Sequence, residues 1–252
     1  MGKRTRHTIG VLLLACMAAW NPDAAAEDDF GMSYSLGVEK KFSKKTKLEG
    51  EVELRTRNDS KTLDRWNLGV SASHKPTTWL KGEVGYQWLY DNNRENITYN
   101  TSGSYNNWRP SYWGSRHRFH VGVTGSLDLG RFGFSLRERY QYTYRPAATT
   151  TRYDFDNEWW EDTEVRAKHK HVLRSRLKID YNIPKSKLTP YVSAELFNDL
   201  SLTKSRFTAG ADYTLKKKHT FGVFYRYQVV NDNDDDNETN EHMIGLSYQF
   251  KF

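Results

Sequence analysis

The sequence predicts an all-β protein in which about 12 antiparallel strands (10–12) close into a transmembrane barrel behind a cleaved signal peptide. Three observations support this prediction. Apolar and polar residues alternate through eleven segments of about the length that a tilted membrane strand needs. The 252-residue chain has a mean hydropathy of −0.85, yet 14% of its residues are aromatic. Short and long polar connections also alternate between the segments, as they do between the two ends of a barrel.

Residues 1–26 have the order of a secretory signal. Basic residues open the chain, the apolar run IGVLLLACMAAW follows at 9–20, and three alanines then lead into an acidic stretch. This order predicts cleavage after Ala26, export across the inner membrane and a barrel made of residues 27–252. The apolar run is shorter than the ~20 residues of a helical membrane span. Lipidation of Cys16 is an alternative that the sequence leaves open.

Composition limits the class of protein further. The one cysteine, Cys16, lies in the predicted signal, so we expect neither a disulfide nor a thiolate metal site in the barrel. A soluble domain this polar would bury too little apolar surface to fill a core. A barrel resolves the contradiction, because its apolar side chains face lipid while its polar ones face the interior. We therefore expect a Gram-negative protein surrounded by outer-membrane lipid, with no enzyme activity, cofactor, metal ion or nucleic-acid partner.

The segment KLEGEVELRTR at 47–57 shows the alternation most plainly. Leu48, Val52 and Leu54 fall on one face, while every position of the other face is charged. Residues two apart on a strand share a face, so one face is expected to meet lipid and the other the lumen. The same pattern, often ending in Tyr or Trp, recurs along the chain. In order, the expected strands are 31–42, 47–57, 65–74, 79–90, 116–129, 132–144, 169–183, 188–197, 204–215, 220–230 and 241–252.

The connections set the direction of each strand. Short turns are expected on the periplasmic side and longer loops on the outer side. Eleven segments conflict with the even number of strands usual in bacterial barrels, and the turn pattern makes the first strand run inward. We therefore expect a twelfth strand hidden within 91–115, or an unusual path for residues 27–30. The short connections lie at 44–46, 75–78, 129–131, 184–187 and 216–219, and the longer ones at 58–64, 91–115, 145–168, 198–203 and 231–240.

The segment MIGLSYQFKF at 243–252 alternates apolar and polar residues up to Phe252. As the closing strand it would run inward, so Phe252 is expected to lie against lipid at the periplasmic aromatic girdle. This ending resembles the C-terminal signal of bacterial outer-membrane proteins. The resemblance implies that the barrel-assembly machinery recognises the chain through Phe252.

Basic residues recur on the face expected to line the lumen. Four strands carry Arg-x-Arg, and both arginines of each pair fall on the polar face. Guanidinium groups bind carboxylates and phosphates through two-point contacts, so an arginine-lined lumen would attract small anionic solutes. Several inward carboxylates, including Glu83 and Asp180, are expected nearer the periplasmic side. The residues expected to face the lumen and its anions are Arg55, Arg57, Arg65, Arg116, Arg118, Arg137, Arg139, Arg174, Arg176 and Glu195.

Three functions are compatible with this pattern. The barrel could be a narrow, porin-like channel for small anionic solutes. Alternatively, arginine–carboxylate ladders could fill the lumen of a closed barrel with a structural or binding role. The third interpretation is a membrane-embedded lipid hydrolase, because Ser115, His117 and His120 lie close in sequence. His117 and His120 fall on opposite faces of their strand, however, so no catalytic residue is assigned.

Several stretches resemble a known bacterial family. The motifs are R-x-R-L-x-x-x-Y at 174–181 and P-Y-V-x-x-E-L-F at 190–197, with weaker similarity at 38–57, 63–75 and 83–89. They are similar to the family named domain of unknown function 2490, over nearly all of the expected barrel. The resemblance implies an outer-membrane barrel but no activity. It draws attention to Arg174, Arg176, Tyr191 and Glu195.

Overall fold

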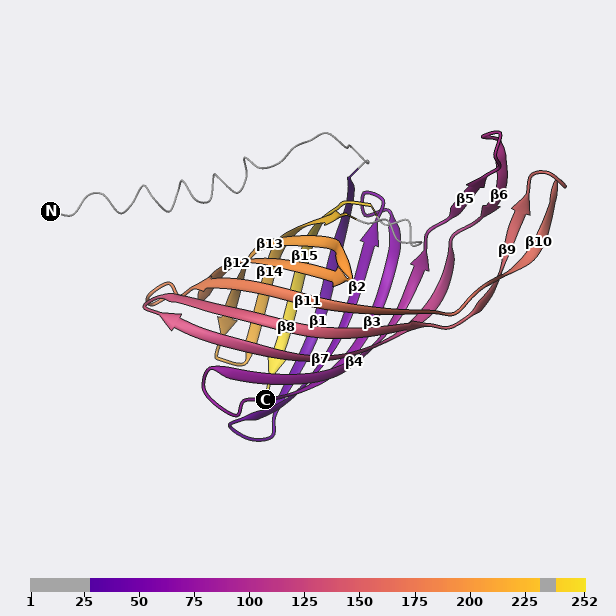
Figure 1. Cartoon of the computed structure of the whole chain (residues 1–252). Helices are drawn as coiled ribbons and strands as arrows, with labels where there is room; N and C mark the ends of the chain where they lie inside the picture. Colours follow the sequence, from indigo (N-terminus) through magenta and orange to yellow (C-terminus); the bar gives the residue numbers. More distant parts are fainter. Residues whose placement is uncertain (1–27, 232–238) are drawn as a thin grey trace.

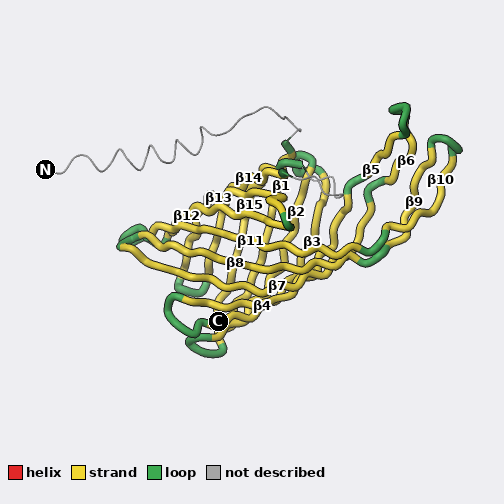
Figure 2. Tube along the Cα trace, in the orientation of Figure 1, coloured by secondary structure: helices red, strands yellow, loops and turns green. Residues whose placement is uncertain are grey.

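The computed structural model describes residues 28–231 and 239–252. Eleven strands form a closed barrel, and four shorter strands form a separate sheet (Figures 1 and 2). Within the described ranges, no helix is long and apolar enough to cross a membrane. The predicted signal at 1–26 lies outside the described residues.

All eleven segments expected from the alternation are barrel strands, with ends that differ by a few residues, so the all-β barrel is confirmed. In chain order they are β1 (Asp29–Lys41), β2 (Thr46–Arg57), β3 (Thr62–His74), β4 (Leu80–Asn93), β7 (Tyr112–Leu129), β8 (Phe132–Arg145), β11 (Lys168–Tyr181), β12 (Leu188–Asp199), β13 (Ser201–Leu215), β14 (His219–Val230) and β15 (Glu241–Lys251).

The barrel has eleven strands, within the expected range of 10–12, but the twelfth strand expected within residues 91–115 is absent from the described barrel. The short strands in that range, β5 (Asn96–Tyr99) and β6 (Tyr105–Arg109), belong to the separate sheet. An odd number of strands can close only if one neighbouring pair is parallel. β1 and β15 are that pair, and they run side by side from Asp29 opposite Glu241 to Glu39 opposite Lys251. β1 therefore runs from the long-loop end to the short-turn end, which is the inward direction that the turn pattern predicts.

Backbone hydrogen bonds extend this closure to both ends of the parallel pair. At the end that carries the long loops, the Asp29 amide donates to the Asn240 carbonyl at 2.9 Å. At the end that carries the short turns, the Phe252 amide donates to the Glu39 carbonyl at 3.0 Å. A membrane barrel needs this continuity, because an open strand edge in hydrocarbon would leave backbone groups without partners.

The two faces of the barrel wall differ in chemistry, as the alternation predicts. Outward side chains are apolar and exposed, for example Leu36 at 64% and Leu127 at 58%. Inward side chains are polar and buried, for example Ser33 at 2%, Asn67 at 5% and Glu53 at 7%. The outer surface is thus the lipid-facing one, and the lumen is narrow enough to bury charged groups.

Aromatic residues concentrate at the two rims of this outer surface. At the long-loop end, tyrosine hydroxyls contact the Nδ1 atoms of histidines on the next strand, as in Tyr142 with His169 and Tyr140 with His171, both at 2.6 Å. At the short-turn end, Phe132 packs on Tyr181 with ring centroids 5.0 Å apart. These rims have the composition of the interfacial girdles that hold a barrel in the bilayer.

The separate sheet is formed by the two long loops at 91–115 and 145–168 and lies beyond the barrel wall (Figure 1). Its strand order is β10 (Trp159–Val165), β9 (Ala148–Asp154), β6 and β5. Trp108 of β6 lies opposite Tyr153 of β9, and the rings of Tyr153 and Trp108 each contact Trp160. These aromatic contacts join the two loops into one sheet on one side of the mouth.

Deleting Phe252 should lower the amount of folded barrel several-fold while leaving export intact. The deletion removes the amide that bonds to Glu39 and a ring that contacts Phe250 at 5.4 Å. Heat-modifiable gel mobility of outer-membrane fractions measures the folded fraction. Phe252→Tyr keeps the ring and the backbone and serves as the control. A deletion variant that accumulates normally would contradict a role of Phe252 in assembly.

Candidate functional site: the arginine-lined lumen

A cavity of about 370 Å³ occupies the lumen toward the long-loop end of the barrel. Its described lining includes seventeen Arg and Lys side chains but only six carboxylates. The lining reaches Arg94 and Arg109 at the roots of the loops, so the cavity extends to the mouth. Every residue singled out from the sequence lines it, namely Arg55, Arg57, Arg65, Arg116, Arg118, Arg137, Arg139, Arg174, Arg176 and Glu195.

Glu195 on β12 is the centre of a cluster with three arginines. Its Oε1 accepts from Arg137 Nη2 at 2.6 Å, and its Oε2 accepts from Arg174 Nη2 at 2.9 Å, with Arg206 Nη1 3.7 Å away. Glu195 is 4% exposed. The charges sit on adjacent strands because Glu195 lies opposite both Arg176 and Arg206 in the sheet register. One buried carboxylate thus holds three guanidinium groups against the wall.

Phe197, two residues beyond Glu195, packs under the same cluster. The guanidinium carbons of Arg174 and Arg206 lie 4.5 and 4.8 Å from its ring centroid. The ring face attracts both cations and fixes the planes of their guanidinium groups. The motif noted at 190–197 therefore has a structural meaning, because its Glu and Phe together position the arginines of the strands on either side.

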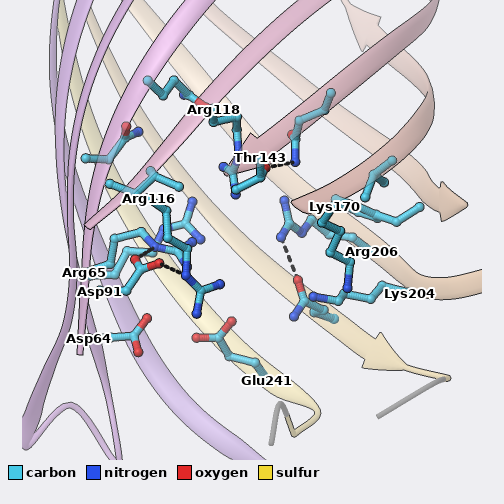
Figure 3. Close-up of a pocket in the computed structure, with 18 of the residues that line it drawn as sticks. Asp64, Arg65, Asp91, Arg116, Arg118, Thr143, Lys170, Lys204, Arg206 and Glu241 are labelled. Atoms are coloured by element: carbon cyan, nitrogen blue, oxygen red, sulfur yellow. Dashed lines mark hydrogen bonds and ion pairs between the residues drawn. The ribbon is translucent and has the colours of Figure 1, made fainter. Parts of the chain in front are cut away.

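A second cluster forms nearer the mouth around Asp91, which is 4% exposed. Its carboxylate accepts from Arg65 Nε and lies 3.0 Å from Arg116 Nε (Figure 3). Arg57 pairs with Asp64 at 3.0 Å beside it. Carboxylates therefore lie in the outer half of the lumen as well as in the periplasmic half, where the sequence places several of them. Asp64 and Asp91 were missed because the segments around them were interpreted as loops, although Asp91 continues the inward parity of Gln87 and Leu89.

Four arginines of the cavity lining differ from those held by carboxylates. Among the described residues, no carboxylate lies within ion-pairing distance of Arg109, Arg118, Arg176 or Arg226. Arg118 donates only to the Thr143 hydroxyl, at 3.3 Å (Figure 3). Arg226 lies over the Phe224 ring at 4.6 Å. Arg118 is also repelled by Arg65, Arg174 and Arg55. The lumen consequently carries guanidinium charge beyond what its described carboxylates neutralise.

Several buried donors in this region also lack acceptors. The Nε atoms of Arg174, Arg176, Arg206 and Arg226 are buried, and no described residue accepts from them. Buried polar groups are normally hydrogen-bonded, so these donors without acceptors are an unusual feature of the arginines that line the cavity. Four such donors on strands β11, β13 and β14 line the same part of the lumen.

The lumen is more tightly filled toward the short turns. Glu83 there contacts Arg139, Lys81 at 3.0 Å and His120 at 3.3 Å. His120 is 6% exposed and lies against Gly85, where an added Cβ would sit 2.4 Å from the imidazole ring. Glu83 and His120 do not line the cavity. The cavity is therefore a cup that opens toward the loops above a constriction of paired side chains.

The residues considered for ester hydrolysis are separated by the barrel wall. Ser115 and His117 face outward, where they contact Trp88 Nε1 at 3.3 Å and the Tyr86 hydroxyl at 2.8 Å. His120 faces inward to Glu83. These contacts place Ser115 and His120 on opposite faces of β7. In the described part of the chain, no cluster of three or more His, Cys, Asp or Glu side chains is arranged to hold a metal ion.

One protein family and several solved structures are similar to this chain. The family model described as "Protein of unknown function (DUF2490)" matches residues 30–239. The β domain of the Bordetella autotransporter BrkA is similar over 82% of this chain and 81% of that one, with 13% identity and a TM-score of 0.50. The NanC porin aligns over 89% of this chain and 99% of its own, with 14% identity and a TM-score of 0.48. No curated protein matches the chain.

Replacing Glu195 with Gln should destabilise the barrel by about 3–5 kcal/mol, because Arg137, Arg174 and Arg206 then lose their shared counter-charge. Urea unfolding in lipid vesicles measures this change. Glu161→Gln removes an ion pair with Arg152 on the separate sheet, where both side chains are at least 30% exposed, and should cost little. Equal stability of the two variants would contradict the role assigned to Glu195.

Proposed function

The chain belongs to the family described as Protein of unknown function (DUF2490), and we propose that it is an outer-membrane barrel whose arginine-lined lumen takes up small anionic solutes and forms a narrow channel for them. The observation that carries the proposal is that Arg118, Arg176 and Arg226 line the cavity with no described carboxylate within ion-pairing distance. Guanidinium charge of this kind in a low-dielectric channel raises the local concentration of anions.

The chemistry of the cavity favours oxyanions over halide as the preferred solute. Guanidinium groups present paired donors that match carboxylate, phosphate and sulfate oxygens. Arg118 and Arg176 have no carboxylate partner among the described residues, and the buried Nε of Arg176 has no acceptor there. A volume of about 370 Å³ is at the lower end of the range for small-molecule pockets, which suits a small organic anion.

A solute can pass through the barrel only if the constriction toward the short turns opens. The contacts of Glu83 with Lys81 and His120 would have to separate, or a solute would have to exchange with them one step at a time. Multi-site exchange of this kind is how selective channels combine binding with release. Arginines near the mouth would collect the anion, and the paired charges below would set the limiting size.

The constriction also favours a second candidate function, a closed barrel that binds an anion without conducting it. His120, Glu39 and Ser73 are only 6%, 3% and 7% exposed, so the short-turn half leaves little free space. Calorimetric titration with citrate and inorganic phosphate separates the two functions when combined with conductance. Binding without current would favour the closed barrel, whereas current that saturates with citrate would favour the channel.

Replacing both Arg118 and Arg176 with Gln should reduce anion selectivity several-fold in planar bilayers. Neither arginine pairs with a described carboxylate, so the substitutions leave no buried acid behind and the barrel should still fold. Reversal potentials in a chloride gradient, repeated with citrate, measure the selectivity. Arg131→Gln with Lys217→Gln removes the same charge from exposed short turns and should change nothing. A cation-selective wild type, or a double variant with unchanged selectivity, would reject the proposed anion channel.

We also propose that the chain reaches the outer membrane through a signal cleaved after Ala26. The basic start, apolar run and alanine triplet of residues 1–26 support this proposal. The intact mass of the membrane-bound protein should correspond to a chain that begins at Glu27, both in the wild type and in Cys16→Ser. A mass that corresponds to a lipidated Cys16 would contradict cleavage at that site.

A further inference from the structure

The lipid-facing surface of the barrel carries an unexpected carboxylate. Glu138 on β8 is exposed between Leu136 and Tyr140, which are 53% and 46% exposed on the outer face, while Arg137 and Arg139 point inward. Between the two aromatic rims, Glu138 is the one charged side chain that the described barrel strands direct outward. It lies six residues from Phe132 at the short-turn rim, or about 15 Å along the barrel axis at the usual rise and tilt.

The contacts of Glu138 within its own chain are limited. The Ser175 hydroxyl, opposite it on β11, donates to Oε2 at 2.6 Å. Among the described residues, no Lys, Arg or His lies within ion-pairing distance of the carboxylate. One hydroxyl satisfies only part of the hydrogen-bonding capacity of a carboxyl group. Because hydrocarbon offers no donors, ionisable groups at this depth normally face a protein partner.

The surface beside Glu138 permits close approach of another molecule. Val123 of β7 lies opposite Glu138, and the next outward residue on that strand is Gly125. A Cβ at Gly125 would meet no atom within 4 Å, so the outer surface is open there. Val123 is in turn opposite Gly82 of β4, a second outward position without a side chain. Small residues beside a polar group are the features that bring transmembrane elements into contact.

We propose that the outer face of β7, β8 and β11 is a contact between two copies of this chain, centred on Glu138 and Ser175. The Ser175 hydroxyl is already bonded to Glu138 of its own chain, so the remaining capacity of the patch is that of the carboxyl group, which in its acid form both donates and accepts. A two-fold axis through the patch brings the two carboxyl groups together, so that the O–H of each donates to the carboxyl oxygen of the other copy instead of facing hydrocarbon. The acyl chains that surround the barrel at this depth cannot provide such partners.

Cysteine cross-linking in lipid vesicles tests the contact. In a Cys16→Ser background, Leu136→Cys places a thiol beside Glu138, and Leu246→Cys places an equally outward thiol on β15, several strands away around the barrel. We expect copper-catalysed oxidation at a low protein-to-lipid ratio to give dimers for Leu136→Cys and few for Leu246→Cys. Adding Glu138→Leu should lower the dimer yield at position 136 by about tenfold, whereas Glu138→Gln, which keeps an acceptor and donors, should largely retain it.

A purely structural role for Glu138 predicts a different result. If Glu138 only braces Ser175, Glu138→Leu should destabilise the single barrel and leave cross-linking unchanged. If the copies meet at Glu138, the same variant should fold at least as stably, because Leu suits lipid, and should lose only association. Heat-modifiable mobility reports folding independently of the cross-link. Equal dimer yields at positions 136 and 246, or an unchanged yield with Glu138→Leu, would overturn the proposal.

Discussion

Parallel hydrogen bonding between β1 and β15 closes the barrel, and the rest of the structure depends on that closure. Eleven strands cannot close with antiparallel pairs alone, so one pair must run in the same direction. The pairing removes the two strand edges that hydrocarbon would not tolerate. It also fixes the inward and outward faces of every strand around the ring, since a slip by one residue would turn charged side chains toward lipid.

With the faces fixed, the lining of the lumen contains fewer carboxylates than basic side chains among the described residues. Glu195 and Asp91 hold arginines of other strands against the wall, and these pairs stabilise the register of the strands. Glu53 holds Arg55 of its own strand. The arginines left over cannot be explained by packing alone, because buried charge without a counter-charge is costly. The proposal of anion binding in the lumen therefore rests on Arg118, Arg176 and Arg226.

On the outer surface the chemistry is reversed, because apolar side chains cover the wall and a charged side chain is the exception. Leucine, valine and aromatic residues cover the band between the rims, where Tyr–His pairs and phenylalanines mark the two interfaces. Glu138 breaks this rule in the middle of the band. Departures of this kind in a membrane protein usually have a functional partner, because each polar group must be satisfied from within the membrane. The inner and outer walls thus each carry polar groups that the described residues leave incompletely paired.

The sequence by itself determined the strand segments, because a period of two and the size of the membrane act locally on each one. It also determined that the arginine pairs at 137/139 and 174/176 face the lumen, since parity along a strand needs no knowledge of its neighbours. Only the tertiary structure decided the odd strand count, the pairing of Asp91 with Arg65 and Arg116, and the joining of the 91–115 and 145–168 loops into a separate sheet. These features depend on cross-strand register between residues far apart in the chain, and alternation within a strand carries no information about which residue lies opposite.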